Sequence, residues 1–161
     1  MINITLPEYQ SHFMEKVHKP KKVFVQGAIS PEFVSKSIAS HQSKTDIGAH
    51  AIFLGQIRAD QKPEGVVTGI EYSAYEEMAE NAFHEIREAA FTKFELTCLH
   101  IYHSLGIVPT GEISLFVFVS SPHRRAAFEA SEYIVEEIKA NVPIFGKELV
   151  GDGNYVWKEN K

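Results

Sequence analysis

The chain has 161 residues, of which 44% are hydrophobic and 23% charged, a composition typical of one globular domain with a real core. Its formal net charge of −5 argues against a general nucleic-acid-binding protein, because such proteins usually carry a basic surface. Cys98 is the single cysteine, so an intramolecular disulfide is excluded, and we expect no cysteine-based metal site and a reducing, cytoplasmic environment.

The N-terminal part of the chain predicts an extension, a strand and a short helix. Residues 1–22 lack the continuous apolar core of a signal peptide and end in the proline-broken connector KVHKPKK. VFVQGAIS predicts a short strand and a turn, and Ser30 followed by Pro31 predicts the N-cap and first residue of a helix. No segment has the length of a transmembrane span, so we expect one domain over residues 1–161 and no membrane association.

The next part of the chain predicts two strands and a long helix. Residues 47–60 are apolar and rich in strand-forming residues, and a second such run covers residues 65–75, so we expect these two strands to pair. A helix follows, in which apolar residues recur every fourth position at Met78, Ala82, Ile86 and Ala90.

The last third of the chain predicts a central strand, a second long helix and two closing strands. GEISLFVFVSS is apolar on both faces, which predicts a strand that is covered on both sides. A helix with Ser121 as N-cap begins near Pro122 and stops before Pro143, and PIFGKELV and NYVW then predict short strands. We therefore expect an α+β fold with two long helices packed on a mostly antiparallel sheet.

The stretch SSPHRRAAFEA places cationic side chains at a helix N-terminus, where the helix dipole disfavours them. The free backbone N–H groups of that first turn bind anions, and His123 and Arg124 would strengthen such a site, so we expect them to bind a phosphate or carboxylate. The simpler interpretation, an ion pair one turn apart, is the one we favour for Arg125 with Glu129.

One lysine lies at the other end of the same helix, and a second follows shortly after it. Lys139 suits a last helical turn, and a rigid turn then brings back Lys147, so the two ammonium groups would lower each other's pKa if they met. Arg124 and Lys139 are 15 residues apart, which is roughly 22 Å along a straight helix. If both serve one site, that site is shared across a dimer interface.

Cys98, His100 and His103 do not indicate a functional site. Cys98 suits a packed core thiol, and His100 and His103 point to opposite faces of one strand.

Five segments occur in a recognisable order: FLGQIR, IEYSAYEEMAE, HSLGIVPTGE, SSPHRRAAFEA and IKANVPIFGKE. Together they resemble the large, catalytic subunit of molybdopterin synthase over residues 23–157. The resemblance implies an α/β hammerhead fold and a homodimer of this chain within a heterotetramer. It also implies a small ubiquitin-like partner, whose C-terminal thiocarboxylate delivers sulfur to cyclic pyranopterin monophosphate to form the dithiolene of molybdopterin. No cofactor, metal, nucleic acid or membrane is implied.

The resemblance also implies roles for particular residues of this chain. Lys139 and Lys147 are expected to be catalytic, with Lys139 near the thiocarboxylate carbonyl, where it transfers a proton or stabilises an oxyanion. His123 and Arg124 are expected to come from the neighbouring protomer. The full set of expected substrate-binding residues is Phe53, Gln56, Ile57, Arg58, His123, Arg124, Lys139, Gly146, Lys147 and Glu148.

The chain departs from the resemblance at two positions. Gly146 stands where the family usually has its second catalytic lysine, and Lys147 can replace that lysine only if the strand bends at Gly146. Ser104 stands where many relatives have arginine. The Gly146 departure leaves an alternative function open: a non-catalytic anion-binding or scaffold homologue that has lost the second catalytic lysine.

Overall fold

The structure is a computed structural model that describes residues 20–151 and 153–159. Most of the predicted N-terminal extension, residues 1–22, therefore lies outside the described residues. The elements, in chain order, are β1 (Phe24–Gln26), α1 (Pro31–Ala39), β2 (Ala49–Gln56), β3 (Gln61–Lys62), β4 (Gly65–Ala74), α2 (Glu76–Lys93), β5 (Cys98–Pro109), β6 (Ile113–Ser121), α3 (Arg124–Asn141), β7 (Ile144–Val150) and β8 (Asn154–Trp157). None of the described helices is long and apolar enough to cross a membrane.

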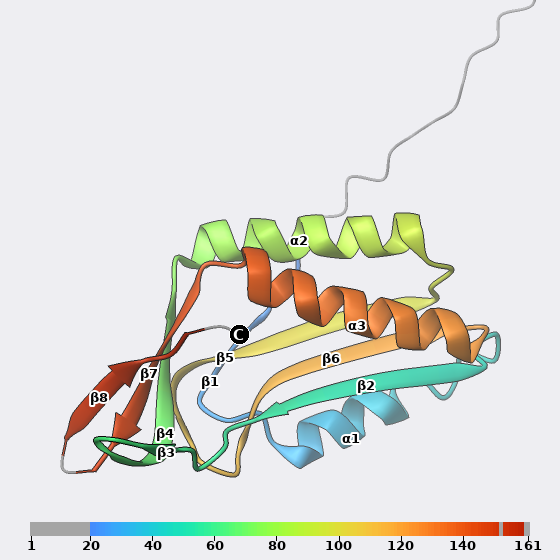
Figure 1. The fold of residues 1–161 in the computed structure, drawn as a ribbon. Helices are drawn as coiled ribbons and strands as arrows, with labels where there is room; N and C mark the ends of the chain where they lie inside the picture. The colour runs from blue at the N-terminus through green and yellow to red at the C-terminus, as the bar shows by residue number, and fades with distance from the viewer. Residues whose placement is uncertain (1–19, 152, 160–161) are drawn as a thin grey trace, which may run out of the picture.

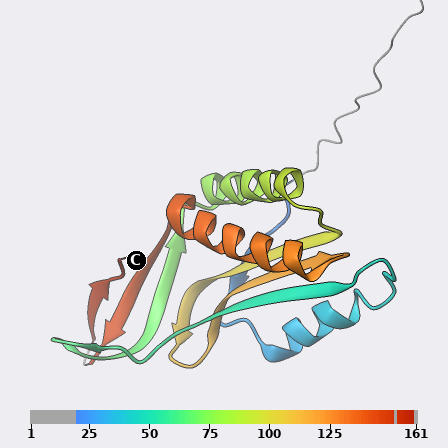
Figure 2. The same cartoon turned by 45° about the vertical axis from the view of Figure 1, so that its right-hand side comes forward.

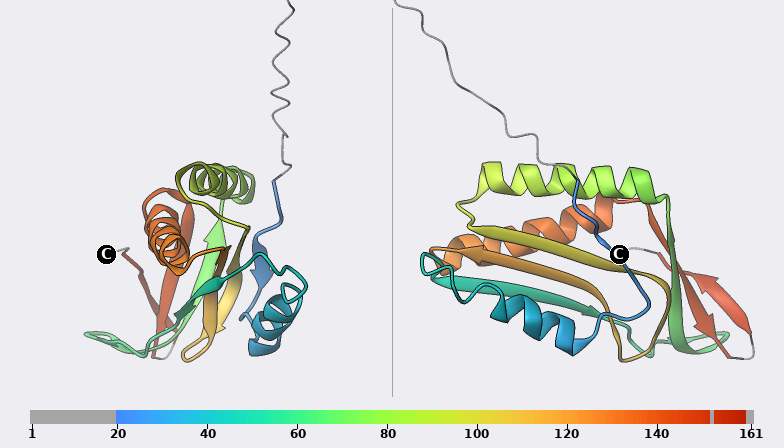
Figure 3. Two further views of the ribbon diagram at one scale, coloured as in Figure 1. Left: turned by 90° about the vertical axis from the view of Figure 1, so that its right-hand side faces the viewer. Right: turned by 180° about the vertical axis from the view of Figure 1, so that it is seen from behind.

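The strands form one open sheet in the order β2-β6-β5-β4-β7-β8, with β1 beside β5 and β3 beside β4. All described strand pairs are antiparallel except β1 with β5. Helices α2 and α3 cover one face of the β2-β6-β5 part, and α1 lies against the opposite face (Figures 1 and 3). The predicted α+β fold, with two long helices on a mostly antiparallel sheet, is confirmed.

The sheet is divided by the course of β5. Its first half, Cys98–His103, pairs with β6, whereas residues Gly106–Pro109 pair with β4. Gly106, the first residue of the second half, has φ +78°, a backbone conformation that favours glycine. Strands β4, β7 and β8 consequently run steeply across the direction of β2, β5 and β6 (Figures 1 and 2).

Strand β6 is the centre of the fold, as its two apolar faces predict. Leu115, Val117 and Val119 pack with the α2 and α3 residues of the main core, and Phe116 and Phe118 pack on the α1 side. Each of these five side chains is at most 5% exposed. Burial of apolar surface on both faces explains why the strand has almost no polar side chain before Ser120.

The predicted pairing of the first two strands is wrong. β2 pairs with β6 from Ala49 to Gln56. The strand from this region that pairs with β4 is the two-residue β3. The doubly apolar β6 needs a neighbour at each edge, and β2 fills one of them. Chain proximity favoured the β2–β4 hairpin, but residues 57–60 carry the chain away from β2 before β3 begins.

Two details of the long helices also differ from the prediction. Met78 is 64% exposed, and the buried stripe of α2 is Ala79, Phe83, Ile86 and Ala90, because a constant four-residue step drifts around a helix of 3.6 residues per turn. Helix α3 begins at Arg124 with His123 as N-cap, two residues later than predicted. Ser121 still belongs to β6, where its Oγ accepts the His123 N–H at 3.2 Å.

The remaining elements follow the prediction. Ser30 caps α1 by accepting the Phe33 N–H through its Oγ at 3.2 Å, with Pro31 as the first helical residue. The α3 stripe of Ala127, Ala130, Ile134 and Ile138 is buried. Strands β7 and β8 form the closing hairpin, which packs on β4 at the end of the molecule away from the N-terminus of α3 (Figure 1).

Candidate functional site

A cleft opens where the steep strands β4, β7 and β8 meet the C-terminal end of α3. It has two adjoining parts that share Lys139, Trp157 and Lys158. Six of the expected substrate-binding residues line it: Gln56, Ile57, Arg58, Lys139, Gly146 and Glu148. The structure therefore brings together residues from the end of β2, the last turn of α3 and the middle of β7.

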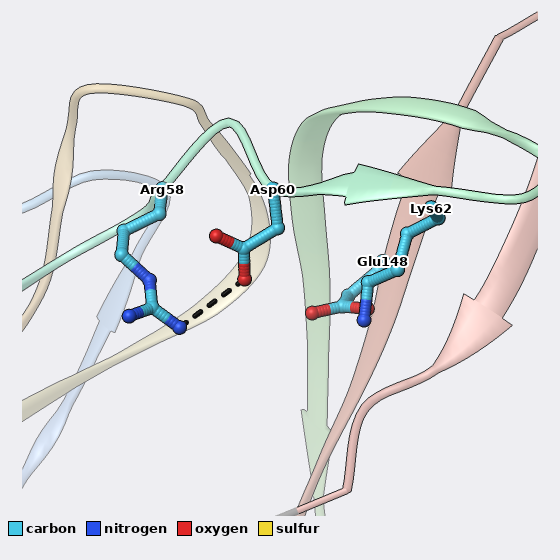
Figure 4. Close-up of polar contacts among 4 residues, drawn as sticks. All are labelled: Arg58, Asp60, Lys62 and Glu148. Carbon is cyan, nitrogen blue, oxygen red and sulfur yellow. Dashed lines mark hydrogen bonds and ion pairs between the residues drawn. The ribbon is translucent and has the colours of Figure 1, made fainter.

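The open part of the cleft carries two ion pairs, and one of them involves a buried carboxylate. The Arg58 guanidinium donates to Asp60 at 3.2 Å, and the Arg58 side chain is 82% exposed (Figure 4). Lys62 Nζ lies 2.8 Å from Oε2 of Glu148, whose side chain is 6% exposed (Figure 4). This carboxylate raises the pKa of Lys62 from its ordinary value, chiefly through the direct contact between the two side chains. Glu148 thus holds the Lys62 ammonium at the rim in an ion pair.

Lys139 is the lysine that the helix itself delivers to the cleft. The preceding residue, Ile138, is buried in the main core, and Lys139 lies one position further around α3, exposed at the cleft wall. The last turn of a helix carries partial negative charge, which suits an ammonium group. Lys139 is therefore held by the packing of α3 while its side chain meets the cleft.

His103 forms part of the inner wall of the cleft. Its Nδ1 donates to the backbone carbonyl of Ser104 at 2.8 Å, and its ring packs edge-on against Tyr72 with 4.9 Å between centroids. The pKa of His103 is lowered to about 4, chiefly by burial; the bond to Ser104 opposes the change, and the ammonium groups of Lys139 and Lys158 contribute to it. His103 is consequently a neutral imidazole at neutral pH, with its proton on Nδ1.

Lys158 is the cleft residue that the sequence did not single out. It follows β8 directly, and its backbone N–H donates to the Gly146 carbonyl at 2.8 Å. Partial desolvation lowers the pKa of Lys158, and repulsion from Lys139 adds to this effect while Glu148 opposes it. The hairpin register could have identified Lys158. Counting outward along both strands from the turn between β7 and β8 places residue 158 opposite residue 146.

Lys147 does not line the cleft. Strand β7 pairs with β4 in regular register from Ile144 to Leu149, so the chain does not bend at Gly146. Lys147 Nζ lies 5.1 Å from the ring centroids of both Tyr155 and Trp157, on the face opposite to that of residue 146. The structure thus does not bring Lys147 beside Lys139.

Three other expected residues lie away from the cleft. Phe53 lines a shallow hollow between β2 and the middle of α3. His123 and Arg124 are exposed at the N-terminal end of α3, opposite to the end that carries Lys139. The first turn of α3 holds no acidic side chain and His123 makes no side-chain capping bond, so this end keeps the features of an anion site.

A cluster of possible metal ligands lies on the other face of β5. His41, Cys98 and His100 bring ligand atoms within 4.8 Å of one another, although the sequence argued against a cysteine-based metal site. Cys98 also accepts a bond from Lys44 Nζ at 2.6 Å. The expectation that His100 and His103 face opposite ways is confirmed, because His100 meets His41 and His103 lines the cleft.

Fold and site together define an α+β protein with a cleft, lined by cationic and acidic side chains, at the junction of two sheet directions. The family described as MoaE protein matches residues 28–141, and the chain belongs to this family, the catalytic subunits of molybdopterin synthase. The chain is 35% identical to the molybdopterin synthase catalytic subunit of Rattus norvegicus over 147 residues, covering 90% of this chain and 71% of that protein.

Solved structures agree with this assignment. Molybdopterin synthase from Staphylococcus aureus has a TM-score of 0.74 and 30% identity, and the match covers 88% of this chain and 99% of that one. A complex of subunits 1 and 2 of molybdopterin-converting factor from Helicobacter pylori has a TM-score of 0.72 and 23% identity, covering 86% of this chain and 90% of that one. The predicted family resemblance is confirmed.

Proposed function

We propose that this chain transfers sulfur from the C-terminal thiocarboxylate of a small ubiquitin-like subunit to cyclic pyranopterin monophosphate, forming the dithiolene of molybdopterin. The observation that carries the proposal is the cleft, where Arg58, Lys139 and Lys158 line one space beside the buried Glu148. Cations around a confined space suit a phosphate and a thiocarboxylate, both of which are anions.

The source of the sulfur follows from the chemistry of the cleft. None of its described lining residues is a cysteine, and Cys98 meets His41 and Lys44 on another face of β5. This supports a second molecule as the carrier of the transferred sulfur. The complex of two subunits from Helicobacter pylori supports a protein partner in that role. The proposed reaction uses no cofactor and no metal. We place this enzyme in the cytoplasm.

Lys139 is the principal catalytic residue of this proposal. Once the thiocarboxylate sulfur has bonded to the substrate, water attacks the carbonyl carbon of the tail, and the C–S bond breaks to leave a carboxylate on the tail and the sulfur on the substrate. The Lys139 ammonium stabilises the oxyanion that develops in this attack, or it supplies the proton for that step. Arg58 and its neighbours Gln56 and Ile57 hold the substrate, and Glu148 holds Lys62 at the rim.

His123 and Arg124 complete the site from a second copy of the chain. Arg124 and Lys139 lie in one helix, α3, roughly 22 Å apart along its axis, so one small substrate cannot touch both within a protomer. A homodimer that aligns the two ends of α3 solves this problem. With one small subunit bound to each protomer, the assembly is a heterotetramer.

The proposal is tested by mixing the chain with a thiocarboxylated small subunit and cyclic pyranopterin monophosphate and measuring the dithiolene product. We expect product from the unsubstituted chain, none from Lys139→Ala, and normal product from Lys36→Ala, which removes an exposed lysine of α1. The Lys139→Ala dimer should remain intact by light scattering. Near-normal product from Lys139→Ala would refute the role of Lys139.

A second candidate function rests on Gly146. A chain without a lysine at that position can be a non-catalytic anion-binding or scaffold homologue that keeps the fold. The same assay separates the two functions, because a scaffold binds the small subunit and yields no product. In that case Gly146→Lys is the first substitution to make.

A further inference from the structure

Lys158 occupies the space beside Gly146. A Cβ atom built on Gly146 would lie 3.6 Å from Cβ of Lys158, and the backbones of the two residues are joined by the 2.8 Å bond from the Lys158 N–H to the Gly146 carbonyl. Directly opposed residues of antiparallel strands project from the same face of a sheet. The Lys158 side chain therefore leaves β8 on the face that a side chain at position 146 would use.

The surroundings of Lys158 are those of the reaction cleft. Lys158 shares both parts of the cleft with Lys139, and the two ammonium groups act together on the buried His103. Lys158 is exposed as a residue, but protein atoms partly desolvate its amine and Lys139 repels its charge, so its pKa is lowered from its ordinary value. By contrast, Lys147 packs against Tyr155 and Trp157 on the other face.

We propose that Lys158 is a second catalytic lysine, which reaches the reacting group from β8 and takes the position that Gly146 leaves open on β7. The inference rests on the proposed sulfur transfer. Lys139 and Lys158 then flank the anionic reacting group from α3 and from β8. The hairpin of β7 and β8, which fixes their register, is what aligns the two lysines.

The test compares three single lysine variants in the sulfur-transfer assay with the complete complex. Lys158→Met should lower the rate of product formation by about 100-fold or more, the range of general acid–base catalysis. Lys147→Met and the exposed control Lys36→Met should retain the rate. Each variant is first shown to bind the small subunit and to unfold at the normal temperature, so a loss of rate reports on the chemistry.

A second experiment moves the lysine from position 158 to position 146. In Gly146→Lys/Lys158→Ala the lysine returns to β7, where the new Cβ would lie 3.1 Å from Cγ2 of Ile70, which has to move by a few tenths of an ångström. This double variant should regain at least tenfold over Lys158→Ala. An active unsubstituted chain with a fully active Lys158→Met overturns the inference, as does loss of rate in Lys147→Met alone. An inactive unsubstituted chain that binds its partner overturns the proposed function instead.

A second, independent observation concerns His41, Cys98 and His100. Cys98 and His100 are two residues apart in β5 and share a face, and His41 follows the end of α1. Nδ1 of His41 lies 2.7 Å from the Ser37 carbonyl, so Nδ1 carries the proton and Nε2 offers a lone pair. That Nε2 accepts the Nε2–H of His100 at 3.0 Å, so His100 has to release this proton or move it to Nδ1 when a cation binds. A backbone carbonyl that orients an imidazole in this way is a common feature of metal ligands.

The geometry points to a binding site for a borderline divalent cation such as Zn²⁺ or Co²⁺, held by two imidazoles and one thiolate. Ligand distances of about 2.0–2.3 Å to zinc bring such atoms to within about 4 Å of one another, close to their present spread of 4.8 Å or less. Lys44 is exposed and donates to Cys98, so it must swing into solvent when the cation binds. The site would join the loop after α1 to β5.

Titration of the purified full chain with Co²⁺ tests this site, because thiolate coordination produces a charge-transfer band in the near ultraviolet. We expect one equivalent to bind, the band to vanish in Cys98→Ser, and at least tenfold weaker binding in His100→Gln. Lys44→Met should strengthen binding, and His84→Gln is the matched control. Absence of stoichiometric binding, or a band that persists in Cys98→Ser, overturns the proposal; if Cys98→Ser fails to fold, His100→Gln decides it.

Discussion

His103 makes the stability of this fold depend on pH, and the size of the effect follows from its burial. Its pKa falls from 6.5 in an unfolded chain to about 4 in the cleft wall. Below pH 6.5 the unfolded chain binds a proton at His103 that the folded chain does not bind. The contribution of His103 to the free energy of unfolding is therefore complete above pH 6.5 and is lost as the pH falls toward 4. At about 1.4 kcal/mol per pH unit, the loss reaches about 3 kcal/mol.

The measurement is urea unfolding of the unsubstituted chain and of His103→Asn at pH 7 and pH 4.5. Asparagine can donate to the Ser104 carbonyl from nearly the position of Nδ1 and cannot take up a proton. By pH 4.5 the unsubstituted chain should have lost about 2.5 kcal/mol more than the variant, each compared with its own value at pH 7. His84→Asn, which removes a half-buried imidazole of α2, should behave like the unsubstituted chain.

Equal losses in the unsubstituted chain and in His103→Asn would refute this reasoning, because the buried imidazole would then be taking up its proton within the folded state. His100, whose pKa is likewise lowered to about 4 by burial, contributes to the acid loss of both proteins and cancels in the comparison.

Three further predictions follow from packing and exposure. Gly48→Ala should lower the free energy of unfolding by about 1–3 kcal/mol, because its Cβ would collide with the backbone carbonyl of Pro122; urea unfolding measures this. Phe83→Ala should cost about 3–5 kcal/mol in the same experiment, since Phe83 is 2% exposed, whereas Phe128→Ala, at 65% exposed, should stay within about 0.5 kcal/mol. Arg58→Ala should change stability by less than about 1 kcal/mol and raise KM for the phosphate-bearing substrate about tenfold or more, as steady-state kinetics would show; an unchanged KM would contradict its binding role.

The elements of the fold were largely predictable, because each has a local cause. The alternation in GEISLFVFVSS is apolar on both faces, and this alone identified β6 as the covered central strand. The pairing of β2 was not predictable in the same way. Two strands that are neighbours in the chain normally pair, and only the need of β6 for an apolar partner at its second edge decided otherwise.

The residues of the candidate site also divide into those that local sequence predicted and those that depend on long-range packing. The ends of β2 and α3 place Arg58 and Lys139 in the cleft, and both were expected there. Lys158 was missed because its role depends on cross-strand register, which leaves no motif in the sequence. The metal-ligand cluster was missed because His41 and Cys98 are far apart in the chain and meet only after α1 packs beneath the sheet.

The bend of β5 at Gly106 gives the cleft a mechanical character. One continuous strand belongs to both sheet directions, so the strands on either side of the bend are parts of a single hydrogen-bonded framework. Opening the angle between the two sheet directions would break ladder bonds on both sides of the bend. The sheet side of the cleft is therefore rigid. In the proposed reaction, a thiocarboxylate carried on an extended protein tail suits an entry that the sheet does not widen.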